Sequence, residues 1–224
     1  MNVPAHRLNQ IRRKLDRLLT YDIEECAGLD LGIREHRFRL EPPLPEAEVA
    51  AFEERYGISL PPEYRDFITS IGSSGAGPYY GLLSLAQATD HLNCDDEVMC
   101  RRELAATCCL SDKLKFYESD NPFKKDWLVE VGGVNWHKRQ FEPEFWDPFQ
   151  GTMAICDQGC TYYAVLVLNG PQRGAIWNIE LHLSPPMKAP YTGFLDYYED
   201  WVDRMLAKEE QFWYGYPRVQ KSEE

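Results

Sequence analysis

The chain has 224 residues, 44% of them hydrophobic and 13% aromatic, and this composition is typical of a globular protein rather than a disordered one. The sequence contains no run of about 18 apolar residues, so we expect no membrane-spanning helix. The net charge is −12, with +2 on residues 1–40 and −14 on the remainder. This acidic excess argues against nucleic-acid binding, because phosphate contacts need lysine and arginine. It is compatible with a basic protein partner, although an acidic surface that only maintains solubility is the simpler explanation.

The N-terminal sequence and the cysteines indicate a compartment. Residues 1–19 carry scattered charges and lack the apolar centre of a signal peptide. The seven cysteines are an odd number and include the adjacent pair Cys108 and Cys109. This usage favours a reducing compartment over a disulfide framework. We therefore expect a cytoplasmic protein.

The first predicted element is an amphipathic helix over residues 5–20. Pro4 suits the first turn of a helix, and apolar residues follow it at helical spacing. These residues are Leu8, Ile11, Leu15, Leu18 and Leu19. Residues 21–44 are mixed in character and end in the stiff sequence EPPLP. We assign residues 1–41 to an N-terminal helical extension.

Two further helices are predicted, each opened by proline and ended by glycine. The first begins at Pro45 and stops at Gly57. The second begins at Pro61 and Pro62 and stops at Gly72. Apolar side chains recur along one face of each, so both helices should cover a core.

A glycine-rich turn, SSGAGP (73–78), leads from the second of these helices into YYGLLSL (79–85), which has a strand pattern. A phosphate-binding loop would follow a strand and precede a helix, and here that order is reversed. We therefore explain the glycines by positive φ and close backbone approach, and we expect Gly77 and Gly81 to occupy such positions.

Residues 86–146 are the least regular part of the sequence. They contain the acidic run Asp95-Asp96-Glu97 and a predicted strand, WLVEV, at residues 127–131. Four of the seven cysteines also lie here: Cys94, Cys100, Cys108 and Cys109.

The pattern beyond this region is strongly β. Three segments rich in β-branched and aromatic residues are separated by short turn sequences: GTMAICD (151–157), TYYAVLVLN (161–169) and GAIWNIE (174–180). They predict an antiparallel meander. Residues 191–206 then predict a closing helix with an apolar stripe, and residues 207–224 a C-terminal tail. The expected fold class is α+β, a single domain at residues 42–206 in which a mostly antiparallel sheet packs with N-terminal helices and a closing C-terminal helix.

Four passages in series resemble the Smi1/Knr4 family, the core of the SUKH superfamily. They are LPPEYRDFITSIGSSGAGP, YGLLSL, GTMAICDQGCTYYAVLVLNG and RGAIWNIE. The resemblance covers roughly residues 42–206, and residues 86–146 exceed the length of a minimal member. SSGAG departs from the Asn-Gly-Gly type of turn found in many members, which should change a turn and not the fold.

The resemblance implies binding rather than catalysis. Bacterial members are mostly immunity proteins that neutralise toxins encoded nearby, often nucleases, and eukaryotic members are linked to cell-wall synthesis and its signalling. The positions that match the family pattern are scaffold positions: Leu60, Pro61, Tyr64, Phe67, Gly77, Pro78, Gly81, Gly159, Gly170, Gly174 and Trp177. We expect a non-enzymatic immunity protein without cofactor or metal, whose partner is a basic toxin bound through Asp95, Asp96 and Glu97. A regulatory interaction module of Smi1/Knr4 type is the alternative.

A thiol- or zinc-dependent hydrolase is the alternative from another class. Cys156 and Cys160 flank a tight turn and His182 follows, but a cysteine in a strand more often fills space in the core. The same two cysteines form one C-x₃-C pair, to which His91 could add a ligand. The second pair of a structural zinc site is missing.

Overall fold

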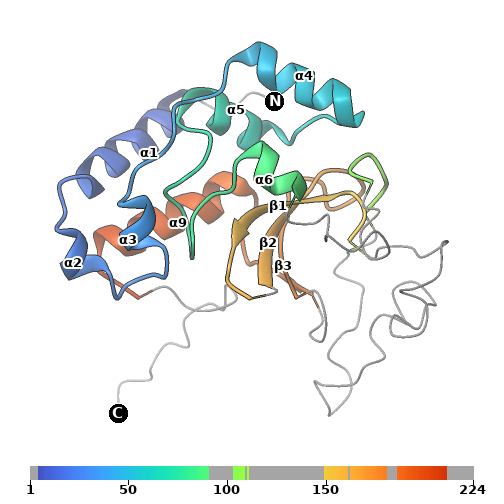
Figure 1. Cartoon of the computed structure of the whole chain (residues 1–224). Helices are drawn as coiled ribbons and strands as arrows, with labels where there is room; N and C mark the ends of the chain where they lie inside the picture. The colour runs from blue at the N-terminus through green and yellow to red at the C-terminus, as the bar shows by residue number, and fades with distance from the viewer. Residues whose placement is uncertain are drawn as a thin grey trace, which may run out of the picture.

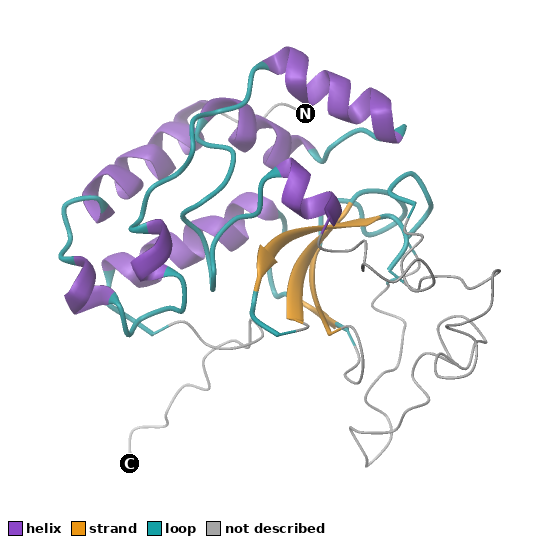
Figure 2. Ribbon diagram, viewed as in Figure 1, coloured by secondary structure: helices purple, strands orange, loops and turns teal. Residues whose placement is uncertain are grey.

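The computed structural model describes residues 5–90, 103–108, 110, 149–160, 162–180 and 186–210. Helices surround one side of a small antiparallel sheet (Figures 1 and 2). None of the described helices combines the length and the apolar character needed to cross a membrane. The elements in chain order are α1 (Ala5–Leu18), α2 (Ile23–Cys26), α3 (Ile33–His36), α4 (Glu46–Tyr56), α5 (Pro62–Ser70), α6 (Leu85–Asp90), β1 (Thr152–Asp157), β2 (Tyr162–Val167), β3 (Ile176–Glu180), β4 (Met187–Lys188) and α9 (Phe194–Leu206).

The sheet is the predicted antiparallel meander, in the order β1-β2-β3-β4. Met153 pairs with Leu166 across β1 and β2, and Leu166 pairs with Ile176 across β2 and β3. The register of β1 and β2 shifts between Ala154 and Cys156, as in a β-bulge. Together with the helices, this sheet confirms the α+β class.

The free edge of β1 is continued by single bridges rather than by a strand. Leu82 bridges Cys156, Gly75 bridges Leu82, and Leu40 bridges Gly75. The strand predicted at residues 79–85 is therefore wrong except at Leu82, and Leu85 already begins α6. The cause is the backbone, because Tyr79 (φ +59°) and Gly81 (φ +102°) leave the extended region on either side of Tyr80.

The glycines of this turn follow the prediction. A Cβ on Gly81 would lie 2.2 Å from the Gly75 carbonyl oxygen, and a Cβ on Gly77 would lie 2.8 Å from Leu82 Cγ. Gly81 also has the positive φ given above, whereas Gly77 is required for close approach alone.

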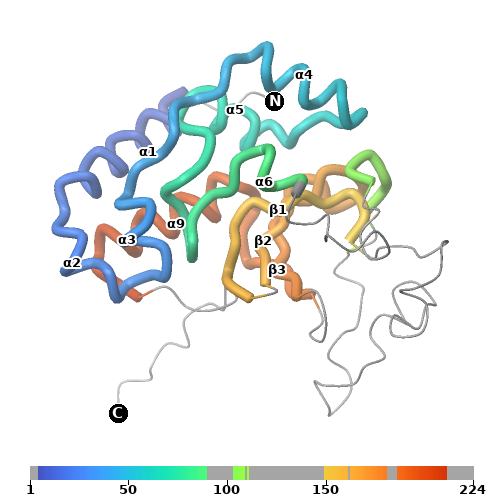
Figure 3. The backbone as a smooth tube through the Cα atoms, viewed as in Figure 1, coloured from blue at the N-terminus to red at the C-terminus, as the bar shows by residue number. Residues whose placement is uncertain are grey.

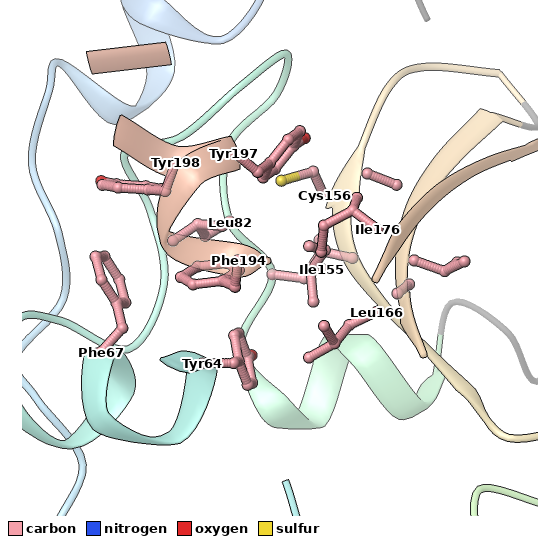
Figure 4. Packing of buried hydrophobic residues seen from close by; sticks show 14 of the residues in the cluster. Tyr64, Phe67, Leu82, Ile155, Cys156, Leu166, Ile176, Phe194, Tyr197 and Tyr198 are labelled. Carbon is pink, nitrogen blue, oxygen red and sulfur yellow. The ribbon is translucent and has the colours of Figure 1, made fainter. Parts of the chain in front are cut away.

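The closing helix α9 is the centre of the core. Figure 4 shows its aromatic side chains between those of α5 and the apolar face of the sheet. The Phe67 ring lies 4.5 Å from the Tyr198 ring and 5.2 Å from the Phe194 ring, centroid to centroid. Tyr64 meets Phe194 edge to face at 5.0 Å. Edge-to-face and tilted pairs are the favourable arrangements for aromatic rings, so the aromatic spacing of residues 194–206 sets how α5 and α9 dock.

The helix predicted at residues 5–20 is confirmed as α1, and it packs along α9. Ile11, Leu15 and Leu18 are buried on the shared side. Arg7 and Lys14 border this seam, and both make ion pairs with Glu199 of α9, at 3.4 Å and 2.7 Å. The boundaries at residues 41 and 206 stay predictions.

The helices predicted from Pro45 and from Pro61–Pro62 are confirmed as α4 and α5. Gly57 caps α4 in the left-handed conformation, whereas α5 ends at Ser70 with Ile71 as its cap, one residue before the predicted Gly72. The short elements α2, α3, α6 and β4 were not predicted. Each has two to six residues, which is too short to show a hydrophobic period. Asp22, whose Oδ1 accepts from the Glu24 amide at 2.8 Å, was the available signal for the start of α2.

Candidate interaction surface

A buried carboxylate joins three distant segments of the chain. Asp30 is 7% exposed, and its Oδ2 accepts from the Tyr79 amide at 2.8 Å and from the Trp201 indole nitrogen at 2.9 Å. Its Oδ1 accepts from the Leu31 amide at 2.8 Å. One side chain therefore fixes the loop before α3, the glycine-rich turn and α9 relative to one another.

Both backbone polar groups of Tyr79 are hydrogen-bonded. Its amide donates to Asp30, and its carbonyl oxygen accepts from the Gly32 amide at 2.6 Å. The residue is buried and left-handed, a conformation that a tyrosine adopts only when its surroundings impose it. The consequence is that the next side chain, Tyr80, points outward and is 49% exposed.

The turn between β1 and β2 supports Tyr80 from the other side. The Tyr80 amide donates to the Asp157 carbonyl oxygen at 3.1 Å, and Asp157 Oδ1 accepts from the Gly159 amide at 2.7 Å. A Cβ on Gly159 would lie 3.0 Å from Tyr80 Cε2, so the aromatic ring lies directly over this glycine. Cys160 follows in a left-handed conformation and is exposed.

We call the surface formed by residues 27–32, 77–81 and 157–160 the three-loop platform. Three large hydrophobic side chains are exposed in the described part of the chain, and two of them, Leu31 (39%) and Tyr80 (49%), belong to it. The third, Leu19, follows α1. Exposed tyrosines on a firmly held backbone are typical of the anchor residues of protein interfaces.

The groups beneath the platform have unusual proton affinities. Burial raises the pKa of Asp30 to about 7, against the opposing effect of its three hydrogen bonds. Burial lowers the pKa of His36 to about 4, against the Gly77 backbone and the charge of Glu35. His36 stacks edge to face on Trp201 at 5.8 Å and accepts from the Phe38 amide through Nδ1 at 3.0 Å. The neutral ring therefore carries its proton on the buried Nε2.

The side chains around the platform are mainly acidic. The end of α9 lies beside α2 (Figure 3), where Lys208 pairs with Glu25 at 3.0 Å. Arg34 pairs with Glu24, also at 3.0 Å. The segments around the platform carry three Lys or Arg side chains, Arg34, Arg37 and Lys208, within residues 21–37, 157–160 and 206–210. They also carry seven carboxylates besides the buried Asp30: Asp22, Glu24, Glu25, Glu35, Asp157, Glu209 and Glu210.

The acidic run predicted to bind a partner, Asp95, Asp96 and Glu97, lies outside the described residues, as does the predicted strand at 127–131. Sequence reasoning did not find the platform. The only local signal for Tyr80 is the pair of tyrosines after Gly-Pro, which predicts the start of a strand. Asp30 carried no signal at all, because its partners are 49 and 171 residues away in the chain.

The two cysteines considered for the alternative hydrolase, Cys156 and Cys160, differ in environment. Cys156 is fully buried, and burial raises the pKa of its thiol to about 12, opposite to what a nucleophilic cysteine needs. Cys160 is exposed at the turn, and His182 lies outside the described residues. Within the described ranges, no group of three or more His, Cys, Asp or Glu side chains is arranged to hold a metal ion.

The comparisons with known proteins identify the family. Neither the curated proteins nor the solved structures contain a match to this chain. The sequence profile of the SMI1/KNR4 family (SUKH-1) matches residues 43–203, which run from just before α4 to the last turn of α9. This range contains the glycine-rich turn, the whole described sheet and most of the helix that completes the core. The chain therefore belongs to the SMI1/KNR4 family (SUKH-1).

Proposed function

We propose that the protein is a cytoplasmic, non-enzymatic immunity protein that neutralises a cognate toxin by binding it directly. The family match over residues 43–203 carries this proposal, because the resemblance to Smi1/Knr4 implies binding partners rather than substrates. The acidic charge of −12 supports a basic partner, as a nuclease with a phosphate-binding groove would be. The run Asp95-Asp96-Glu97 is proposed to contribute to the attraction.

Direct binding agrees with the rigidity of the described scaffold. Ring pairs lock α5 against α9, and Asp30 locks the loops at one end of the sheet. A surface held in one conformation loses little entropy when it binds, which favours tight association. Inhibition by occlusion needs such tight association and needs no reacting group.

The test is co-expression of this chain with the toxin-like product of an adjacent reading frame in a heterologous host. We expect the chain to restore growth and to form a complex with that product that survives size-exclusion chromatography. Phe67→Asp serves as the unfolded control, because it places a charge in the centre of the aromatic core. Continued toxicity in the presence of soluble, folded chain would contradict the proposal. A stable complex with a harmless product would favour the regulatory module instead.

A further inference from the structure

We infer that the three-loop platform is the surface that receives a basic face of the partner protein, with Tyr80 and Leu31 as its apolar anchors. The inference rests on the proposed function, since it names the surface through which that function would act. It moves the principal contact from the acidic run at residues 95–97 to residues 27–32, 77–81 and 157–160.

Exposure is the first argument. A Cβ on Gly32 would lie 2.7 Å from Tyr80 Cα, so the backbone next to Leu31 approaches the backbone of Tyr80 closely and both exposed side chains belong to the same surface. Protein interfaces commonly depend on a few such anchors surrounded by polar groups, and tyrosine is among the residues enriched there.

The backbones of both anchors are also held in place before any partner arrives. The Tyr80 ring lies over Gly159 and the Tyr80 backbone is held through its amide, while the Leu31 backbone is held through the bond from its amide to Asp30. The Tyr79 backbone between these contacts is strained and doubly bonded. Fixed anchors reduce the entropy lost on association, and strain of this kind is concentrated at functional sites.

Charge decides the chemistry of the partner. Carboxylates outnumber cations seven to three around the platform, and two of the three cations are already paired with Glu24 and Glu25. The outer face of α1, in contrast, exposes Arg12, Arg13 and Arg17. A basic surface is therefore attracted to the platform end and repelled by α1.

The decisive experiment uses anchor variants in the growth assay and in binding to the purified toxin that this assay identifies. We expect Tyr80→Ala to weaken the complex at least tenfold, mainly through faster dissociation. Leu31→Ala should weaken it severalfold, and the double variant should no longer protect cells. Leu19→Ala is the matched control, because Leu19 is a large exposed apolar residue like the two anchors but follows α1. The affinity of this variant for the toxin should stay within about twofold of wild type.

A charge-reversal pair tests the chemistry. Glu35→Lys places a cation beside the platform, and Glu54→Lys makes the same change on exposed α4. We expect Glu35→Lys to slow association severalfold at low salt and less at high salt. Equal association rates for the two variants would contradict a basic face at this surface.

Alkylation of Cys160 reports occupancy without changing the anchors. In a Cys94→Ser, Cys100→Ser, Cys109→Ser background, Cys160 is the exposed thiol, since Cys26, Cys108 and Cys156 are buried. Saturating toxin should slow its reaction with iodoacetamide at least tenfold. An unchanged rate of alkylation with toxin present would overturn the inference. If, without toxin, deletion of residues 211–224 made Cys160 react faster, the platform would be assigned to the chain's own C-terminal segment.

The possible failures are distinguishable. Failure of the wild-type chain to neutralise or bind any adjacent product contradicts the proposed function, and the platform inference with it. Full protection by the double anchor variant, with Cys160 still reactive in the complex, leaves the function standing and excludes the platform.

Discussion

At the scale of single residues, Asp30 and His36 are two buried side chains whose pKa values burial shifts strongly. Both lie against Trp201, one bonded to its indole nitrogen and the other stacked on its ring. Their pKa values move in opposite directions, because burial disfavours the charged form of each. Because its pKa is raised in the folded protein, Asp30 contributes stability that is fully present below about pH 4, where the carboxyl group is protonated. This contribution is lost as the pH rises to about 7. The lowered pKa of His36 stabilises the fold above about pH 6.5, and that stability is lost as the pH falls to about 4.

The two effects oppose each other between pH 4 and 6.5, and single variants should separate them. In Asp30→Asn we expect the free energy of unfolding to rise with pH more steeply than in wild type. In His36→Gln the free energy of unfolding should fall with pH relative to wild type. Each unit of pKa shift corresponds to about 1.4 kcal/mol in this free energy. Urea unfolding at several pH values measures these slopes. Identical slopes in all three proteins would show that neither group titrates as its burial requires.

The glycine-rich turn leads to a second prediction at this scale. Gly81→Ala places a Cβ against the Gly75 carbonyl at a positive φ, and Gly77→Val crowds Leu82, so each should destabilise by roughly 1–3 kcal/mol. Gly28→Ala is the matched control, because nothing lies within 4 Å of its Cβ position. Thermal unfolding compares the three. Melting temperatures of the Gly77 and Gly81 variants equal to that of the control would contradict the close approaches.

At the scale of elements, the seam between α1 and α9 combines a buried apolar stripe with half-buried ion pairs. Glu199 accepts from both Arg7 and Lys14, and its side chain is 17% exposed. Asp196 and Asp203 extend the network along α9. Isolated surface pairs contribute little, but a shared and partly buried partner contributes more.

We therefore expect Glu199→Gln to lower the free energy of unfolding by roughly 1 kcal/mol, since two cations lose a partner at once. The exposed pair of Glu24 and Arg34 provides the control, and Glu24→Gln should change stability by a few tenths of that amount. Denaturant unfolding in low and high salt gives both values. A loss in Glu199→Gln no larger than in Glu24→Gln would mean that the apolar stripe alone holds α1.

At the scale of the whole molecule, charge is distributed unevenly, with +2 on residues 1–40 and −14 on the remainder. Attraction between such a body and a basic partner acts over about 10 Å at 0.1 M salt and about 3 Å at 1 M. Charge should thus govern how fast the two proteins meet, while anchors govern how long they stay together.

The acidic run provides the test of long-range attraction. We expect the variant Asp95→Asn, Asp96→Asn, Glu97→Gln to associate with the proposed toxin partner more slowly than wild type at low salt and at a similar rate at high salt. Stopped-flow or surface-binding kinetics at both salt concentrations measure this. An association rate that depends on neither salt nor the substitutions would leave the acidic charge with a role in solubility alone.

The sequence by itself determined the elements that have a long enough local pattern. The 3.6-residue period of α1, α5 and α9 and the β-branched runs of β1 to β3 are local properties, and so are the proline and glycine that bound α4 and α5. The same order of motifs was sufficient to indicate the family, because motif order follows the chain.

Tertiary structure alone decided the platform. Asp30, Tyr79 and Trp201 are far apart in sequence and have no shared period, so nothing local shows that they meet. Tyr80 is exposed only because the backbone at Tyr79 is forced left-handed by bonds to Asp30 and Gly32, which overrides the strand propensity of YYGLLSL. Local propensity is worth tenths of a kcal/mol per residue, whereas burying an unpaired carboxylate or amide costs several-fold more. The distant hydrogen bonds therefore determine the conformation at this site.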